Sequence, residues 1–496
     1  MQLVAAHSRF ARERLAGLCS LALACASASR PTAAPPPVTP AARPSSSASS
    51  AEGRGQGTNS WQEPAWLRDL EIELSALRGL PFKRAVPFSN ESRSAFRAEV
   101  RSELGRELPS AKSSNLGRAY RALGFVAVDI DLAQAMEDAL VTEVAAYYDP
   151  KRRAFKFVGS RPSTATVRLD TVAIHELAHA LQDQHFDLEA FSGDETAASL
   201  DDDQRLARRF LVEGEATFLM MAHDLGSGPP AARRLGSLAV AGLRMNITML
   251  AAADMLELLA SVRQGHSADR LDAETRAELT AIEKLPPLVT LPMIEPYLKG
   301  ALFVSEVWAK GGWAAVDDLY RHPPDSSEQV LHPTERFLRA RDPAVSIRRV
   351  ATPPPWPDAR LLLDEVVGEL GWRVYFKTWN IARGPIAAAG WGGDRMWAWA
   401  IGDRTVACIA TRWDSEADAR EFVDAYEESL ATRFPDRPTA AGAADGFRIT
   451  SPNGDLLSVE RRGRDVDVIA GVRPGELVSL VGQLRAADRR LREPRP

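Results

Sequence analysis

Cysteine is scarce in this chain, with three residues in 496: Cys19 and Cys25 near the N-terminus and Cys408 far downstream. This count excludes a fold held together by a disulfide framework. The sequence also has no block of basic residues, and its formal net charge is only −5, so nothing in the composition indicates nucleic-acid binding. The length exceeds one ordinary hydrophobic core and predicts a globular protein of two or three domains.

A long uninterrupted apolar run is missing as well. The best candidate, residues 238–259, is interrupted by Arg244, Asn246, Asp254 and Glu257. These side chains would be expensive in lipid, so the run is interpreted as a helix of a globular domain.

The N-terminus has the pattern of an export signal. Arg9, Arg12 and Arg14 precede a short apolar run at 15–25, and small residues follow, so residues 1–29 are predicted to be a signal peptide. The segment ending in Cys25, Ala-Leu-Ala-Cys, resembles a bacterial lipobox, which implies a lipidated cysteine that tethers the protein to the cell envelope. Ordinary cleavage with secretion, or a cytoplasmic protein with a disordered start, are the alternatives. Residues 30–60, rich in Pro, Ser and Ala, predict a disordered linker.

The most informative stretch is His175-Glu176-Leu177-Ala178-His179, inside an apolar segment at 172–182 that predicts a helix. A spacing of four places both imidazoles on one helical face, where they can hold one Zn²⁺. Glu176 then lies beside the metal, in reach of a zinc-activated water molecule. The alternative is two partly buried histidines without a metal, which would need other partners.

A second helix, predicted at 204–224, carries Glu213 and Glu215 among apolar residues. Carboxylates in a core-facing helix are costly unless they are paired or bind a metal. The two glutamates are about 200° apart around the helix, so only one can face a zinc ion squarely. Two solvated glutamates are the alternative reading.

The two helices together resemble the gluzincin metallopeptidases, in which two His and one Glu hold zinc and the Glu between the His is the general base. Glu213-Gly214-Glu215-Ala216 is similar to the aminopeptidase-type pattern, which implies Glu213 as the third ligand and leaves Glu215 to orient a ligating histidine. A thermolysin-type alignment would select Glu215 instead. Further segments, among them the one containing Tyr147 and Tyr148, are similar to a set of poorly characterised bacterial proteins with a gluzincin-like core, over roughly 95–430.

Gluzincins place a His or Tyr opposite the zinc to stabilise the oxyanion, and the resemblance makes His332 and Tyr297 the candidates. His332 follows a short helix predicted to begin at Ser326 or Ser327 and to end before Pro333. A structural histidine is the alternative. Upstream, residues 141–157 have a hairpin pattern. In zincins an edge strand at this place pairs with the substrate backbone; a purely structural hairpin is the alternative.

The region after about 351 predicts a second domain. Its expected elements are helices at 361–379, 413–431 and 474–484, a glycine turn at 390–395, and strands at 396–401, 405–411, 446–450, 456–461 and 466–471. The fold class is therefore α+β: a helix-rich zincin-like domain at 61–350 with a small sheet, followed by an α+β domain at 351–496.

The expected function is zinc-dependent hydrolysis of peptide bonds, with Zn²⁺ as cofactor, peptides or proteins as substrates, and Glu176 as base. The alternative is a non-catalytic, zinc-stabilised binding or assembly protein of the envelope on the same scaffold. An intact Glu176 favours the enzyme, because a purely structural zinc needs no base.

Overall fold

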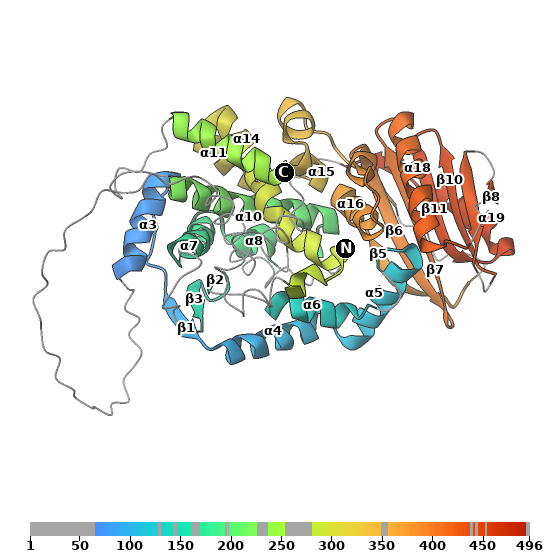
Figure 1. Cartoon of the computed structure of the whole chain (residues 1–496), viewed down its shortest axis with the longest axis horizontal. Coiled ribbons are helices and arrows are strands. Elements are labelled where there is room, and N and C mark those ends of the chain that lie inside the picture. The colour runs from blue at the N-terminus through green and yellow to red at the C-terminus, as the bar shows by residue number, and fades with distance from the viewer. Residues whose placement is uncertain are drawn as a thin grey trace, which may run out of the picture.

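The computed structural model describes residues 65–126, 130–141, 146–159, 169–193, 196, 198–225, 237–252, 280–348, 356–436, 440–441, 445–451 and 454–492. The predicted signal peptide with Cys25 and the predicted linker lie outside these residues. The fold is α+β, as the sequence predicted: helices surround a small sheet in the first part of the chain, and a larger sheet forms most of the second (Figure 1).

The first part begins with helices and a small sheet. They are α3 (Ala65–Arg78), α4 (Arg93–Glu107), α5 (Ser110–Leu123) and α6 (Leu132–Val141). The sheet has the strand order β1-β3-β2, with β1 (Phe88–Glu91), β2 (Ala146–Asp149) and β3 (Ala154–Val158). β2 and β3 form the predicted antiparallel hairpin, and β1 pairs with β3 in parallel.

The central helices position the candidate site. They are α7 (Leu169–Phe186), α8 (Leu188–Ser192), α10 (Asp202–Leu225), α11 (Ser237–Ala252) and α14 (Pro287–Arg321). Both motif-bearing helices confirm the sequence prediction. The backbone of α14 leaves helical geometry at Gly311 and Gly312. None of the helices within the described ranges combines the length and hydrophobicity needed for a membrane span.

The second part is a seven-stranded antiparallel sheet of order β5-β6-β7-β11-β10-β9-β8. Its strands are β5 (Arg360–Glu365), β6 (Trp391–Ile401), β7 (Arg404–Trp413), β8 (Ala440–Ala441), β9 (Gly446–Thr450), β10 (Leu456–Arg462) and β11 (Asp465–Val472). Helices α16 (Gly368–Thr378), α17 (Gly384–Ala388), α18 (Glu416–Arg433) and α19 (Pro474–Ala486) complete it.

Two expectations for this part were wrong. The start of the helix predicted at 361–379 is strand β5, because these residues pair with the edge of β6, and only Gly368 onward is helical. The glycine turn predicted at 390–395 is the beginning of β6 itself, which pairs with β7 through a register shift between Trp391 and Gly393. In both places strand pairing overrides the local pattern.

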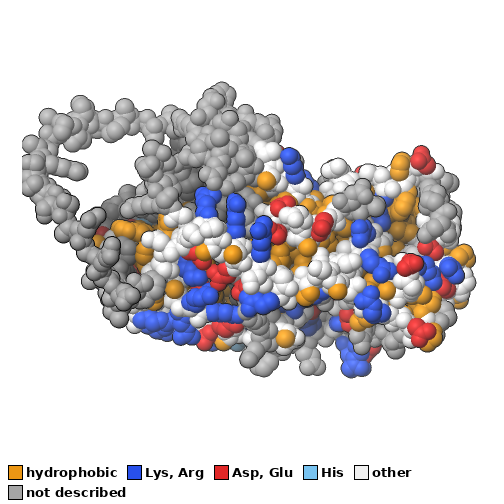
Figure 2. All heavy atoms as spheres, turned by 90° about the horizontal axis from the view of Figure 1, so that it is seen from below, with side chains coloured by type: hydrophobic (Ala, Val, Ile, Leu, Met, Phe, Trp, Pro, Cys, Tyr) orange, Lys and Arg blue, Asp and Glu red, His pale blue; other side chains and the backbone are white. Residues whose placement is uncertain are grey.

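The two parts are packed against each other across the predicted boundary at 351. Helix α15 (Ser327–Leu331), the π-helix η3 (Pro333–Arg339) and strand β4 (Val345–Ile347) connect them, and β4 pairs with β12 (Arg489–Leu491) at the end of the chain. One continuous cluster of buried apolar side chains includes residues of both parts. Viewed from below, the surface mixes basic and acidic side chains (Figure 2), and on α4 Arg101 and Arg106 pair with Glu137 and Glu103.

Candidate metal centre

Helices α7 and α10 bring His175, His179 and Glu213 together. The Nε2 atoms of the two histidines are 3.1 Å apart, and Glu213 Oε2 lies 3.4 Å from His175 Nε2 and 3.6 Å from His179 Nε2. Ligand atoms at about 2.0–2.2 Å from a tetrahedral zinc ion are separated by about 3.3–3.6 Å. The three atoms therefore fit three corners of such a site without movement of the helices.

Burial makes a cation at this place favourable. His175 and Glu213 are 0% exposed and His179 is 2% exposed. Within the described part of the chain, neither carboxylate oxygen of Glu213 has a hydrogen bond of good geometry. An ionised carboxylate and two imidazole lone pairs in an apolar interior need a positive charge between them, which a divalent metal supplies.

The electrostatics of the three side chains agree with this reading. Burial lowers the pKa of His175 to about 4. Burial also opposes ionisation of Glu213, but its contacts with both histidines prevail and bring its pKa to about 2. Burial also opposes protonation of His179, but the Glu213 carboxylate outweighs this effect and raises the pKa of His179. The centre thus holds an anionic glutamate beside a neutral His175.

Hydrogen bonds fix the orientation of His179. Its Nδ1 lies 2.8 Å from Gln182 Oε1. Gln182 Nε2 donates to Val212 O at 3.0 Å and to Glu215 Oε2 at 3.1 Å. Because both acceptors face the amide nitrogen, Oε1 must be the atom that faces His179. His179 then carries its proton on Nδ1 and points the Nε2 lone pair at the centre.

Glu215 accepts the hydrogen bond from Gln182 and does not belong to the group of three possible ligands. This arrangement is the one in which Glu213 would be the ligand and Glu215 a supporting residue. Arg78 Nε donates to Glu215 Oε1 at 2.5 Å, and the Tyr320 hydroxyl donates to Oε2 at 2.5 Å. Arg78 is itself buried, with its guanidinium 4.4 Å from the centroid of the Trp313 ring.

Sequence reasoning missed three members of this network: Gln182, Arg78 and Tyr320. Gln182 had a usable signal, because it lies three residues after His179 on the same helical face. Arg78 and Tyr320 had none, since they are 137 and 105 residues from Glu215 in the sequence.

Glu176 lies on the same helix as the two histidines and is 0% exposed. Its Oε2 accepts the backbone N–H of Tyr148 at 3.0 Å, and its Oε1 has no hydrogen-bond partner among the described residues. Burial raises the pKa of Glu176 to about 8. A nearby divalent cation would lower it again and restore a carboxylate able to accept a proton.

The hairpin strand β2 forms the edge of the small sheet next to α7. Tyr148 N–H donates to Glu176. A substrate strand that paired with β2 at this place would need the same backbone donor. The predicted pairing of β2 with a substrate therefore requires this bond to open.

Of the two oxyanion candidates, only Tyr297 reaches the centre. It lies on α14, and its ring stacks on His175 with centroids 5.6 Å apart and planes at 23°. The helix crossing that brings it there depends on Gly214 and Gly300. A Cβ on Gly214 would lie 2.2 Å from the carbonyl carbon of Gly300.

His332 is placed elsewhere, which corrects its prediction as a catalytic residue. It caps the C-terminal end of α15, and its Nε2 lies 3.0 Å from Glu369 Oε1 of α16. Helix α15 meets the first turn of α10, where Asp203 Oδ2 accepts Ser327 N–H at 3.1 Å. Glu213 lies ten residues further along α10, or about 15 Å along its axis. His332 therefore forms a contact between the two parts of the chain. This is the structural role that the sequence analysis gave as the alternative.

A second acidic group, Glu328, Asp342 and Asp414, also has carboxylate oxygens close to one another. Arg336 already lies among them: its Nε is 3.7 Å from Glu328, its Nη1 is 2.5 Å from Asp342, and its Nη2 pairs with Asp414. The guanidinium supplies the cation here, so the group is an ion-pair cluster between the two parts of the chain.

Comparison with known protein families finds a match in the second part of the chain. Residues 360–480, from β5 to most of α19, match a family described as a domain of unknown function (DUF8575). No curated protein and no solved structure matches the chain. The candidate metal centre lies outside the matched residues.

Proposed function

We propose that this protein is a zinc-dependent peptidase of the gluzincin type, with zinc held by His175, His179 and Glu213. The observation that carries the proposal is the triangle of ligand atoms with edges of 3.1–3.6 Å, with Glu176 on the same helical turn. The separations fit zinc, and the donor set of two imidazoles and a carboxylate is one that catalytic zinc sites use.

The residues of the chain would have the following roles in the reaction. His175, His179 and Glu213 would hold the zinc ion, which when bound would supply polarisation of the scissile carbonyl and a water molecule with its pKa lowered toward about 7. Glu176 Oε1, which has no competing partner among the described residues, takes a proton from the attacking water and passes it to the leaving amine. Gln182 and Glu215 hold His179 in the tautomer that presents Nε2. Tyr297, stacked on His175, is the candidate for stabilising the oxyanion.

The complete burial of the centre favours the second candidate, a zinc-stabilised binding or assembly protein of the envelope. With ligands 0–2% exposed, a peptide reaches the zinc only after a rearrangement, whereas a structural zinc needs no access. The position of Glu176 favours the enzyme: a structural site gains nothing from an uncompensated buried carboxylate beside the metal.

The Glu176→Gln variant separates these candidates. It keeps the shape of the side chain and the acceptor for Tyr148 N–H but removes the base. We expect it to retain zinc and to lose casein or peptide turnover by several orders of magnitude. Equal turnover by variant and wild type contradicts the proposed role. Zinc binding with no turnover in either protein, and unfolding on chelation, favours the assembly protein.

The export signal, the lipidated Cys25 and the cell-envelope location belong to the same proposal. Labelling with a radioactive fatty acid tests it: incorporation should disappear in Cys25→Ser. Incorporation that persists in this variant, or no incorporation into the wild type, contradicts the lipid tether.

A further inference from the structure

Tyr148 of β2 is hydrogen-bonded to α7 through both its backbone and its side chain. Its N–H donates to Glu176 Oε2 at 3.0 Å, and its hydroxyl donates to Asp183 Oδ2 at 2.7 Å. Glu176 and Asp183 are about two helical turns apart, so they lie on one face of α7. A single residue of the hairpin thus spans two turns of the helix that carries both histidines of the candidate centre.

Two arginines add weaker attachments at the same carboxylate. Arg153, in the turn between β2 and β3, and Arg84, ahead of β1, lie 3.8 and 3.7 Å from Asp183 Oδ2. Their side chains are 52% and 42% exposed, so these ion pairs contribute little. Asp183 is buried, and its Oδ1 accepts Leu188 N–H at 3.1 Å. The buried bond from the Tyr148 hydroxyl is therefore the strongest of these three attachments.

The hairpin lies where a substrate would have to approach. Glu176 is the base of the proposed reaction, so the scissile bond must come next to its carboxylate. Glu176 is 0% exposed, and Tyr148 N–H already occupies one of its oxygens. In the view of Figure 1, β2 and β3 lie below α7, whereas α10, which carries Glu213, lies above it. A substrate that enters from the side of the base therefore meets the hairpin.

Opening on the side of α10 would disrupt the proposed site itself. α10 carries Glu213 and crosses α14 at the backbone contact between Gly214 and Gly300. Both helices contribute side chains to the continuous apolar core. Separating them would move a proposed ligand and expose that core.

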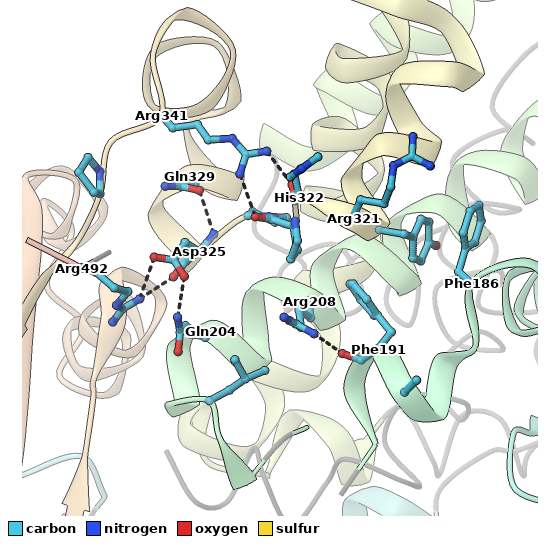
Figure 3. Close-up of a pocket in the computed structure, with 16 residues that line it drawn as sticks. Phe186, Phe191, Gln204, Arg208, Arg321, His322, Asp325, Gln329, Arg341 and Arg492 are labelled. Carbon is cyan, nitrogen blue, oxygen red and sulfur yellow. Dashed lines mark hydrogen bonds and ion pairs between the residues drawn. The ribbon is translucent and has the colours of Figure 1, made fainter. Parts of the chain in front are cut away.

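A cavity of about 410 Å³ beside the C-terminal end of α7 offers no easier path (Figure 3). Its wall includes Phe186 and Tyr320. The Tyr320 hydroxyl donates to Glu215 Oε2, which also accepts from Gln182, and Gln182 orients His179. A substrate that entered from this cavity would break the support of a proposed zinc ligand.

We propose that the β2–β3 hairpin is an autoinhibitory cover of the metal centre, held shut by the bonds of Tyr148 to Glu176 and Asp183. Opening breaks these two bonds and the weak ion pair of Arg153, and it frees the carboxylate of the base. The three proposed ligands keep their places. This role rests on the proposed function, because a cover regulates only a centre that a substrate must reach.

The other face of the hairpin is attached to different elements. Successive side chains of a strand point to opposite faces. The hydroxyl of Tyr147 donates to Glu91 Oε2 of β1 at 2.8 Å, and Arg152 pairs with Glu99 of α4 at 2.8 Å. These contacts can persist when the hairpin parts from α7, so Tyr147 provides a matched control for Tyr148.

The cover is tested by the rates at which the protein releases zinc to excess chelator and takes it up again. We expect Tyr148→Phe to raise both rates about tenfold or more, because it loses a hydrogen bond to a buried carboxylate that holds the hairpin shut. The zinc dissociation constant is the ratio of the two rates and should stay the same, since the ligands and their supports are untouched. Casein turnover should rise in the same variant.

Tyr147→Phe is the control, because Tyr147 and Tyr148 are both 1% exposed and each loses one hydroxyl bond to a carboxylate. It should leave both zinc rates close to those of the wild type. Asp183→Asn keeps an acceptor but loses the charge, so its rates should lie between those of the wild type and Tyr148→Phe. Equal rates in the two tyrosine variants overturn the cover. Faster release without faster uptake also overturns it, since Tyr148 would then support zinc binding and not close the centre.

A second measurement does not depend on zinc. Diethyl pyrocarbonate modifies accessible imidazoles, and peptide mass spectrometry gives its rate at His175 and His179 in the metal-free full-length protein. Both side chains are 0–2% exposed, so we expect modification about tenfold faster in Tyr148→Phe than in Tyr147→Phe. Equal modification in variants that bind zinc overturns the cover and leaves the proposed function standing. Faster modification in a chain that takes up no zinc overturns the proposed function and leaves the hairpin opening standing.

Discussion

The contact between Gly214 and Gly300 is the place where a single methyl group should disturb the metal centre most. A Cβ on Gly214 would lie 2.2 Å from Gly300 C, 2.4 Å from Gly300 O and 2.6 Å from Gly300 Cα. Ordinary carbon contacts are about 3.5–4.0 Å. Backbone atoms cannot rotate away, so Gly214→Ala must push α10 and α14 apart by about 1 Å or more. Glu213 and Tyr297 lie on these two helices.

The energetic cost follows from two opposing terms. Overpacking of a tight core costs about 1–3 kcal/mol, and a backbone clash belongs at the upper end. Replacing glycine by alanine inside a helix stabilises the helix by about 1 kcal/mol. We therefore expect Gly214→Ala to lower the free energy of unfolding by about 2 kcal/mol.

The matched control is Gly242→Ala in α11, where a Cβ meets nothing within 4 Å. It should raise the free energy of unfolding by about 0.5–1 kcal/mol, because only the helix-propensity term remains. Urea unfolding of the metal-free proteins measures both, and zinc titration should show weaker binding by Gly214→Ala alone. If Gly214→Ala is as stable as Gly242→Ala, the close helix crossing is not present in solution.

Three further outcomes are expected. Glu213→Ala should abolish tight zinc binding, whereas Glu215→Ala should weaken it only about 10- to 100-fold, as loss of a supporting residue does; chelator competition measures both, and the reverse order would make Glu215 the ligand. Gln182→Leu should also cost about 10- to 100-fold in zinc affinity, and an unchanged affinity would show that His179 needs no such partner. Burial, and secondarily the charge of Asp201, raises the pKa of Asp203 from 3.8 to about 7. The contribution of protonated Asp203 to the free energy of unfolding is therefore fully present below pH 3.8 and is lost as the pH rises through 7. Wild-type stability should then fall between pH 4 and 8 by on the order of 4 kcal/mol more than that of Asp203→Asn, and parallel pH profiles in urea unfolding would contradict this.

The candidate metal residues could be predicted because their signals are local. His175 and His179 share a helical face through a spacing that any helix imposes, and an acidic pair in an apolar helix needs an explanation wherever it occurs. The preference for Glu213 over Glu215 needed the resemblance to gluzincins. The role of Gly214 was not predicted, because only the structure shows Gly300 against it.

The remaining differences come from long-range contacts. His332 has a motif-like context in sequence, but its partner Glu369 lies 37 residues away in the second part of the chain. Strand β5 has an apolar run that suits a helix equally well, and only pairing with β6 makes it a strand. The boundary predicted at 351 lies just before a proline cluster at 353–357, which marks a change of pattern but does not reveal that β4 and β12 pair across it.

The most direct test of the central claim is the metal content of the purified protein, by mass spectrometry, beside that of His175→Ala, His179→Ala and Glu213→Ala. We expect about one zinc per chain in wild type and little in each variant, because the three ligand atoms together form a single site. Folded wild-type protein that neither contains zinc nor takes it up from buffer would contradict the account.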